Sequence, residues 1–148
     1  MLTAFSFADV SRILSSREIL FGTLGRQPFL RTVVKVTAAE AQLQEIRVLQ
    51  LSLRLSRKHS ALQTSLNTVT YLSDLVNRCT ELGIQIDALV QYEVAKVLWD
   101  QGEMGTSIKM LQLLERREDL HKQALPLSRP ELLATLVCNS LMDSNTLN

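Results

Sequence analysis

The sequence predicts an all-α protein in which antiparallel helical hairpins form a tetratricopeptide-like α-solenoid of about six helices. Five glycines and three prolines in 148 residues are too few for the many turns of an all-β protein. Leucine, isoleucine and valine recur at steps of three and four residues, as they do on one face of an α-helix. Two-helix units also follow one another at a spacing of about 45 residues, which is typical of solenoid repeats.

The first helix is expected over residues 7–24, where one stripe of apolar residues should be buried. Gly25 can adopt the left-handed backbone conformation that ends many helices. Pro28 then begins a connector, in which residues 29–34 form either one more helical turn or a buried loop. The members of the apolar stripe are Val10, Ile13, Leu14, Phe21 and Leu24.

A capping box predicts where the second helix begins. The Thr37 hydroxyl can accept a hydrogen bond from the Glu40 backbone N–H, and the Glu40 carboxylate can accept one from the Thr37 N–H. We expect this helix to end near residue 54, and the third helix to cover residues 58–79 and to end before Gly83. Their apolar stripes are Leu43, Ile46, Leu49 and Leu53, then Leu62, Leu66, Val69, Leu72 and Val76.

The fourth helix is expected to begin at Asp87, a favourable N-cap residue, and the fifth near residue 106 or 107. We expect Trp99, Gly102 and Met104 to form the hairpin corner between them. The indole should pack beneath the turn and donate a hydrogen bond through its ring nitrogen. The inward residues are Val90, Val94, Val97, Leu98 and Trp99 on the fourth helix, and Ile108, Leu111 and Leu114 on the fifth.

A charge-dense turn over residues 115–123 separates the fifth helix from the last one. Ser128 is a good N-cap residue, Pro130 suits the first turn, and Glu131 stands at the capping-box position. We therefore expect a sixth helix that runs to about residue 137.

The chain divides into a leading helix and connector (1–36), a hairpin segment (37–137) and a divergent, frayed tail (138–148). The first seven residues are apolar but lack the basic residues of a signal peptide, and no stretch reaches the ~20 apolar residues of a membrane span. We therefore expect a soluble intracellular protein.

The net charge is +1, from 16 basic and 15 acidic side chains. This balance gives no long-range attraction for a phosphate backbone or an anionic membrane, so no direct nucleic-acid or membrane partner is expected. Cys79 and Cys138 have no neighbouring cysteine, and we expect both to be reduced thiols.

The only compact basic cluster comprises Arg54, Arg57 and Lys58, followed by His59. On a helix such residues spread around the surface, and aromatic residues that could stack on nucleic-acid bases are absent nearby. The cluster is either a solvated turn or a patch that binds a protein partner.

Several runs between residues 15 and 133 have an order that generic helical hairpins do not require. The most specific is Leu-Trp-Asp-Gln-Gly-Glu-Met at residues 98–104. The others lie at residues 15–20, 55–63, 70–75, 90–95, 107–112, 122–123 and 128–133. In these runs the chain resembles a FAT-region segment of the fungal ATM-type kinases, which are PI3-kinase-related Ser/Thr protein kinases.

The resemblance implies a nuclear parent kinase that acts in the DNA damage response and in telomere maintenance, with FAT helices around its kinase domain. None of the ATP-binding or catalytic residues of that family maps onto the chain. We therefore expect a non-catalytic scaffold or regulatory segment that packs on neighbouring helices of a larger kinase. The alternative is a free-standing α-solenoid adaptor that binds a protein partner. The likeness fades after residue 133, which suggests a fragment, a truncated gene product or an altered reading frame at the end.

No catalytic, cofactor, metal or small-molecule site is expected. His59 and His121 lack companions at metal-ligand spacing. Residues 102–105, Gly-Glu-Met-Gly, lack the spacing and the lysine of a P-loop. Residues 119–124, Asp-Leu-His-Lys-Gln-Ala, match the Asp-x-His-x-x-Asn catalytic loop of such kinases except that Ala124 replaces the magnesium-binding asparagine. We interpret this match as coincidence.

Overall fold

A computed structural model describes residues 6–146 of the chain, and the secondary structure within that range is entirely helical. The predicted all-α class is therefore confirmed. In chain order the elements are α1 (Phe7–Arg26), α2 (Pro28–Val34), α3 (Ala38–Lys58), α4 (Leu62–Glu81), α5 (Asp87–Asp100), α6 (Met104–Glu115), the 3₁₀ helix η1 (Asp119–Lys122) and α7 (Arg129–Thr146).

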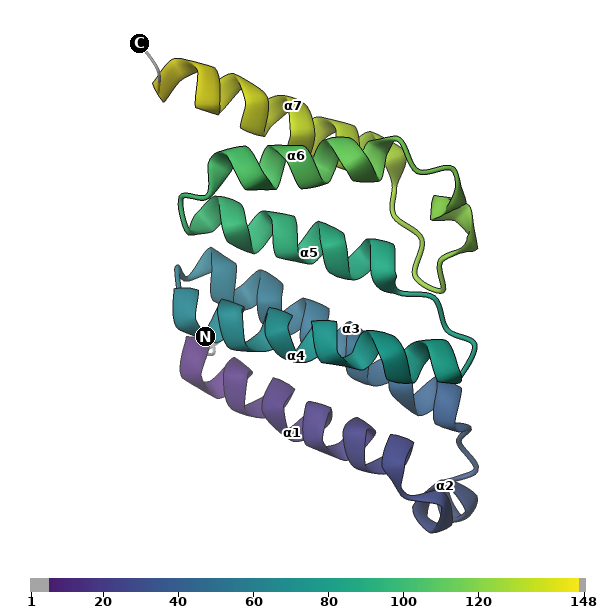
Figure 1. Ribbon diagram of the computed structural model, residues 1–148. Coiled ribbons are helices and arrows are strands. Elements are labelled where there is room, and N and C mark those ends of the chain that lie inside the picture. Colours follow the sequence, from purple (N-terminus) through teal and green to yellow (C-terminus); the bar gives the residue numbers. More distant parts are fainter. Residues whose placement is uncertain (1–5, 147–148) are drawn as a thin grey trace.

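The long helices stack in the order of the sequence, and each runs antiparallel to the next (Figure 1). Helix α1 packs on α3, α3 on α4, α4 on α5, α5 on α6, and α6 on α7. The two hairpins predicted from the sequence, now α3–α4 and α5–α6, are thus confirmed. Because contacts join mainly neighbouring helices, the arrangement is that of a solenoid.

Two clusters of buried side chains hold the stack together. The first joins α3, α4 and α5, with Leu53 and Leu72 fully buried at its centre. The second joins α5, α6 and α7 around Leu111 and Leu114. Truncation of a fully buried leucine to alanine costs about 2–5 kcal/mol, so each cluster fixes one hairpin against the next.

Helix α1 differs from its prediction in two respects. Gly25 lies inside the helix, which ends at Arg26, because Pro28 forces the preceding Gln27 into an extended conformation (φ −106°, ψ 101°). Ile13, expected in the buried stripe, is 50% exposed, whereas Leu14 is buried as predicted. The connector after Pro28 forms α2, which is helical and has no buried residue, so the buried loop is excluded.

The boundary between the second and third predicted helices also lies elsewhere. The Thr37 capping box is confirmed, with the Glu40 N–H donating to the Thr37 hydroxyl at 3.1 Å. Helix α3, however, extends to Lys58, and the chain turns only at Ser60, whose φ is 54°. Consequently α4 begins at Leu62, a residue expected to be buried but 44% exposed.

Helices α5 and α6 begin close to the predicted positions. Asp87 is the first residue of α5 and not its N-cap, because its carboxylate accepts from Gln123 and pairs with Arg117 instead of capping the helix. Helix α6 begins at Met104, two to three residues earlier than expected.

The last helix extends far beyond its predicted end near residue 137. Helix α7 continues to Thr146. The prediction of a frayed tail from residue 138 is therefore wrong for residues 138–146, which are helical. The physical reason is that residues 131–146 contain no glycine or proline that would stop a helix. Residues 147–148 of the tail, like residues 1–5, lie outside the described range, and the division into three segments stays a prediction.

Candidate functional site

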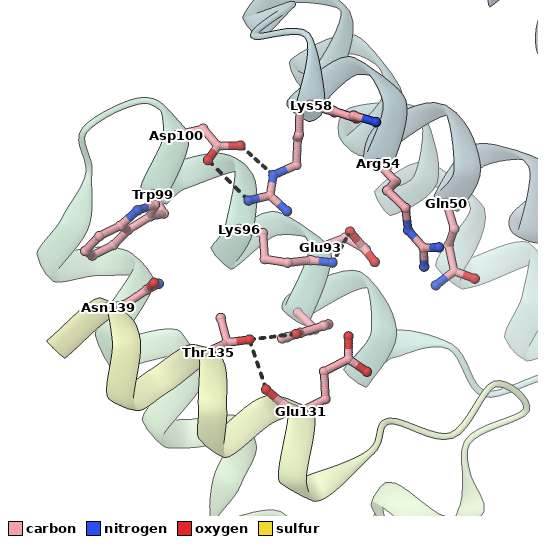
Figure 2. A pocket seen from close by; sticks show the side chains of 12 residues that line it. Gln50, Arg54, Lys58, Glu93, Lys96, Trp99, Asp100, Glu131, Thr135 and Asn139 are labelled. Atoms are coloured by element: carbon pink, nitrogen blue, oxygen red, sulfur yellow. Dashed lines mark hydrogen bonds and ion pairs between the residues drawn. The ribbon is translucent and has the colours of Figure 1, made fainter. Parts of the chain in front are cut away.

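A groove of about 470 Å³ lies between alternate helices of the stack, α3, α5 and α7 (Figure 2). Residues at helical steps of three and four from each helix face it, so it follows one side of the solenoid. It is lined by Gln50, Arg54, Arg57 and Lys58 of α3, by Tyr92, Glu93, Lys96, Trp99 and Asp100 of α5, and by Glu131, Thr135 and Asn139 of α7.

Two polar contacts join the walls of the groove. The Arg57 guanidinium of α3 forms a two-pronged ion pair with the Asp100 carboxylate of α5, with Nη2 and Oδ1 3.2 Å apart. The Tyr92 and Thr135 hydroxyls lie 3.0 Å apart and join α5 to α7. Because both contacts are partly shielded from water, they hold the three helices at a fixed separation.

Lys96 is held within the α5 wall. Its Nζ lies 2.9 Å from the Glu93 carboxylate and 4.4 Å from the centre of the Tyr92 ring. Burial is the main cause that raises the pKa of the Tyr92 hydroxyl, so this group stays protonated and can donate at neutral pH. Because Lys96 and Glu93 form an ion pair, each largely neutralises the charge of the other.

The structure brings the predicted basic cluster and one residue of the predicted hairpin corner, Trp99, to the same groove. Arg54, Arg57 and Lys58 line the α3 wall, but only Arg57 has an ion-pair partner among residues 6–146. Trp99 faces the same groove from α5. Whether the cluster binds a partner stays a prediction.

The hairpin corner has the expected glycine, since Gly102 adopts a φ of 89°. The Gly102 N–H donates to the Trp99 carbonyl at 3.0 Å and closes the turn, and Met104 opens α6. The hydrogen bond expected from the Trp99 ring nitrogen is not found within the described part of the chain. The indole therefore lines the groove with a free N–H.

Sequence reasoning missed the third wall, because nothing in the sequence placed Glu131 and Thr135 beside α3 and α5, and the last helix was expected to end before Asn139. Thr135 and Asn139 line the groove from α7, and Asn139 is only 8% exposed. The signal that could have found them is the step of four residues from Glu131 to Thr135 to Asn139, which places all three on one helix face.

The residues that resemble a kinase catalytic loop have structural roles. Asp119 pairs with Arg117 at 2.6 Å, Leu120 is buried, and Gln123 accepts a hydrogen bond from the Ala88 N–H at the start of α5. This segment therefore fastens the turn after α6 to the N-terminus of α5. Cys79, buried in α4, and Cys138, exposed on α7, are both free thiols.

Among residues 6–146, no three histidine, cysteine, aspartate or glutamate side chains come close enough together to bind a metal ion. The helices in the same range are too short or too polar to cross a membrane.

Comparison with known proteins identifies relatives of the chain, although no protein-family model matches it. It is 46% identical over 128 residues to the serine/threonine-protein kinase tel1 of Emericella nidulans, a match that covers 86% of the chain. It is 43% identical over 143 residues to tel1 of Aspergillus oryzae, a match that covers 97% of the chain. The likeness therefore extends beyond residue 133, where we expected it to fade. In both cases the chain spans about 5% of the relative's length.

Solved structures agree with these sequence matches. The open conformation of CtTel1 is similar over 94% of the chain and 5% of its own length, with a TM-score of 0.85 and 39% identity. The FAT and kinase domain of CtTel1 is similar over 93% of the chain and 10% of its own length, with a TM-score of 0.84 and 41% identity. By sequence and by fold, the chain corresponds to a helical segment of the FAT region of Tel1 (ATM-type) serine/threonine kinases.

Proposed function

We propose that the chain is a non-catalytic scaffold segment whose end helices pack on neighbouring helices of a larger Tel1-type kinase. The main observation in support of this proposal is the position of the exposed apolar side chains. They gather on α1, α2 and α7, at the two ends of the stack (Figure 1). These residues are Ile13, Ile19, Leu20, Phe29, Leu30, Val33, Val34, Leu133, Val137, Leu141 and Met142.

The helices between the two ends bury their apolar side chains much more completely. Among the described residues of α3 to α6, the large apolar side chains classed as exposed are Leu51, Leu62 and Leu113. A free-standing solenoid needs polar outer faces on its terminal helices to stay soluble. On α7, Val137 and Leu141 are instead 54% and 62% exposed and one helical turn apart. This face favours a covered helix within a longer stack over an independent adaptor.

The role of such a segment is mechanical. Each helix is packed against its neighbours by buried side chains, so displacement of one end of the stack can be passed to the other. From the relation to the Tel1 kinases, we place the segment in a nuclear Ser/Thr kinase of the DNA damage response and of telomere maintenance. In this role the chain contributes shape and packing, and the kinase domain contributes the chemistry.

The proposal is tested by the association state of the 148-residue chain, measured by size-exclusion chromatography with light scattering. We expect concentration-dependent dimers or larger aggregates, because the apolar end faces bury each other when no neighbour covers them. A triple variant of α7, Leu133→Gln, Val137→Gln and Leu141→Gln, should shift the chain toward monomer.

The matched control is the double variant Leu51→Gln and Leu62→Gln, which changes exposed apolar residues in the middle of the stack and should leave association unchanged. A wild-type chain that remains monomeric at ~100 µM, well above the dissociation constants of stable interfaces, would refute the proposal.

A further inference from the structure

The groove between α3, α5 and α7 contains polar groups that the fold does not use. Apart from the ion pairs and hydroxyl contacts described above, several of its side chains form no hydrogen bond or ion pair with any residue in the range 6–146. They are Gln50, Arg54, Lys58, Trp99, Glu131 and Asn139 (Figure 2). These side chains are therefore available to form hydrogen bonds and ion pairs with a molecule outside this segment.

Asn139 is the most informative of these residues. Its side chain is more than nine-tenths buried, and it extends from α7 toward Trp99 at one end of the groove. The Asn139 amide atoms are open to the groove, since every fully buried side-chain nitrogen or oxygen among the described residues has a hydrogen-bond partner. An asparagine amide both donates and accepts, as a peptide group does, and can therefore pair with a peptide backbone.

The unused groups are mainly donors. Among residues 6–146, Arg54 and Lys58 have no carboxylate partner and the Trp99 ring nitrogen has no acceptor. Asp100 and Glu93, two of the three carboxylates in the groove, are already paired with Arg57 and Lys96. Glu131 is the one carboxylate of the groove without an ion-pair partner among residues 6–146, and it belongs to the opposite wall on α7. The α3 wall therefore favours an occupant with negatively charged acceptors.

The groove continues into a second hollow of about 250 Å³, which reaches Pro126 and Ser128. The two hollows share the lining residues Gln50, Arg54, Tyr92, Glu93, Lys96 and Glu131. Two joined hollows between three helices suit several residues of an extended chain better than a compact small molecule. Its walls are held apart by the Arg57–Asp100 and Tyr92–Thr135 contacts, so binding requires little rearrangement.

We propose that this groove binds an extended acidic polypeptide segment, whose carboxylates pair with Arg54 and Lys58 and whose backbone bonds to Asn139. The groove is a different surface from the apolar end faces, so this proposal does not depend on the scaffold role.

The test uses a fluorescein-labelled peptide of alternating glutamate and serine, about twelve residues long, with blocked ends. Binding to the full chain is followed by fluorescence anisotropy, in the α7 triple-glutamine variant so that self-association does not interfere. We expect the variant Arg54→Gln/Lys58→Gln to bind at least about tenfold more weakly, because two charge-assisted hydrogen bonds are lost. Asn139→Leu should weaken binding by a similar factor, and Glu131→Gln should tighten it a few-fold.

The matched control is Arg47→Gln/Lys109→Gln, which removes the same charge from exposed positions outside the groove and should leave affinity unchanged. The proposal is overturned if this control weakens binding as much as Arg54→Gln/Lys58→Gln does, or if no variant of the groove changes binding. A lysine–serine peptide that binds as well, or a DNA oligonucleotide that depends on the same residues, would equally overturn it. A monomeric wild-type chain that still binds would refute only the scaffold role.

Discussion

At the scale of single residues, Glu45 is the most consequential polar side chain of the core. It is 2% exposed in the middle of α3, and its carboxylate accepts from the Tyr71 hydroxyl at 2.6 Å and from the Gln42 amide at 2.7 Å. Arg26 of α1 lies 4.0 Å away. Glu45 thus connects α3 to both α1 and α4.

We predict that Glu45→Ala lowers the free energy of unfolding by about 2–4 kcal/mol, since it leaves the buried Gln42 amide and the partly buried Tyr71 hydroxyl without a partner. Tyr71→Phe removes one of the two hydrogen bonds and keeps the ring, and should cost about 1 kcal/mol. Urea unfolding measures both. A loss for Glu45→Ala no larger than that for Tyr71→Phe would contradict this role.

Arg117 links the Asp87 carboxylate at the start of α5 to the Asp119 carboxylate at the start of η1. Its guanidinium lies 2.7 Å from Asp87 and 2.6 Å from Asp119. Although partial burial opposes the effect, the hydrogen bonds from Arg117 and Gln123 lower the pKa of Asp87 below its ordinary value of 3.8. Hydrogen bonding by Arg117 lowers the pKa of Asp119 in the same way. An acid with a lowered pKa stabilises the fold above its unfolded pKa, and this stabilisation is lost as the pH falls through the folded pKa.

We therefore predict that Arg117→Gln lowers the urea midpoint at pH 7, and that the difference from the wild type persists down to the ordinary aspartate pKa of 3.8 and is lost as the pH falls further, through the lowered pKa values of Asp87 and Asp119 in the folded protein. Arg116→Gln, which changes the neighbouring exposed arginine, is the control and should have little effect at any pH. A difference between the wild type and Arg117→Gln that grows in acid would show that the sign of this linkage is wrong.

At the scale of helices, the sequence predicts most elements correctly because their signals are local. The Thr37 capping box and the glycine at the α5–α6 corner are read from a few adjacent residues. The ends of α3 and α7 were placed too early, because neither helix has a glycine or proline stop where its apolar periodicity weakens. Helix α2 could not be decided, since Phe29 and Val33 are apolar yet exposed at an end of the stack.

Gly22 shows how helix packing overrides helix propensity. By propensity alone, alanine in the middle of α1 should stabilise the helix by about 1 kcal/mol. A Cβ at Gly22, however, would lie 2.8 Å from the Glu45 carboxylate oxygen and 2.5 Å from the Arg26 guanidinium. The Arg26 side chain is half exposed and can move, but the Glu45 carboxylate is held by its hydrogen bonds. The absence of a side chain at this position therefore lets α1 approach α3 closely.

We predict that Gly22→Ala destabilises the protein by about 1–2 kcal/mol, measured by thermal or urea unfolding. Gly105→Ala in α6 is the matched control, because no atom lies within 4 Å of the added Cβ, and it should stabilise by about 0.5 kcal/mol. If Gly22→Ala also stabilised the protein, α1 would not be packed on α3 as closely as the structure indicates.

At the scale of the whole molecule, the sequence predicts the stacked hairpins but not the groove. The basic cluster of α3 and the tryptophan of α5 were each recognised, yet nothing local indicates that they face each other. That placement arises because α3, α5 and α7 follow one side of the solenoid, so that residues as far apart in the sequence as Gln50 and Asn139 line the same groove. Long-range placement of this kind depends on the packing of every intervening helix.

The central claim is that neighbouring helices cover the end faces of this segment, and Cys138 can report on it directly. This thiol is exposed on α7 beside Val137, whereas Cys79 is buried in the core. The rate of maleimide labelling of Cys138, followed by mass spectrometry of its peptide, can be compared between the isolated chain and a full-length Tel1-type kinase that contains the segment. We predict rapid labelling in the isolated chain and at least about tenfold slower labelling in the full-length kinase, with Cys79 unreactive in both. Equal rates for Cys138 in the two proteins would contradict the claim.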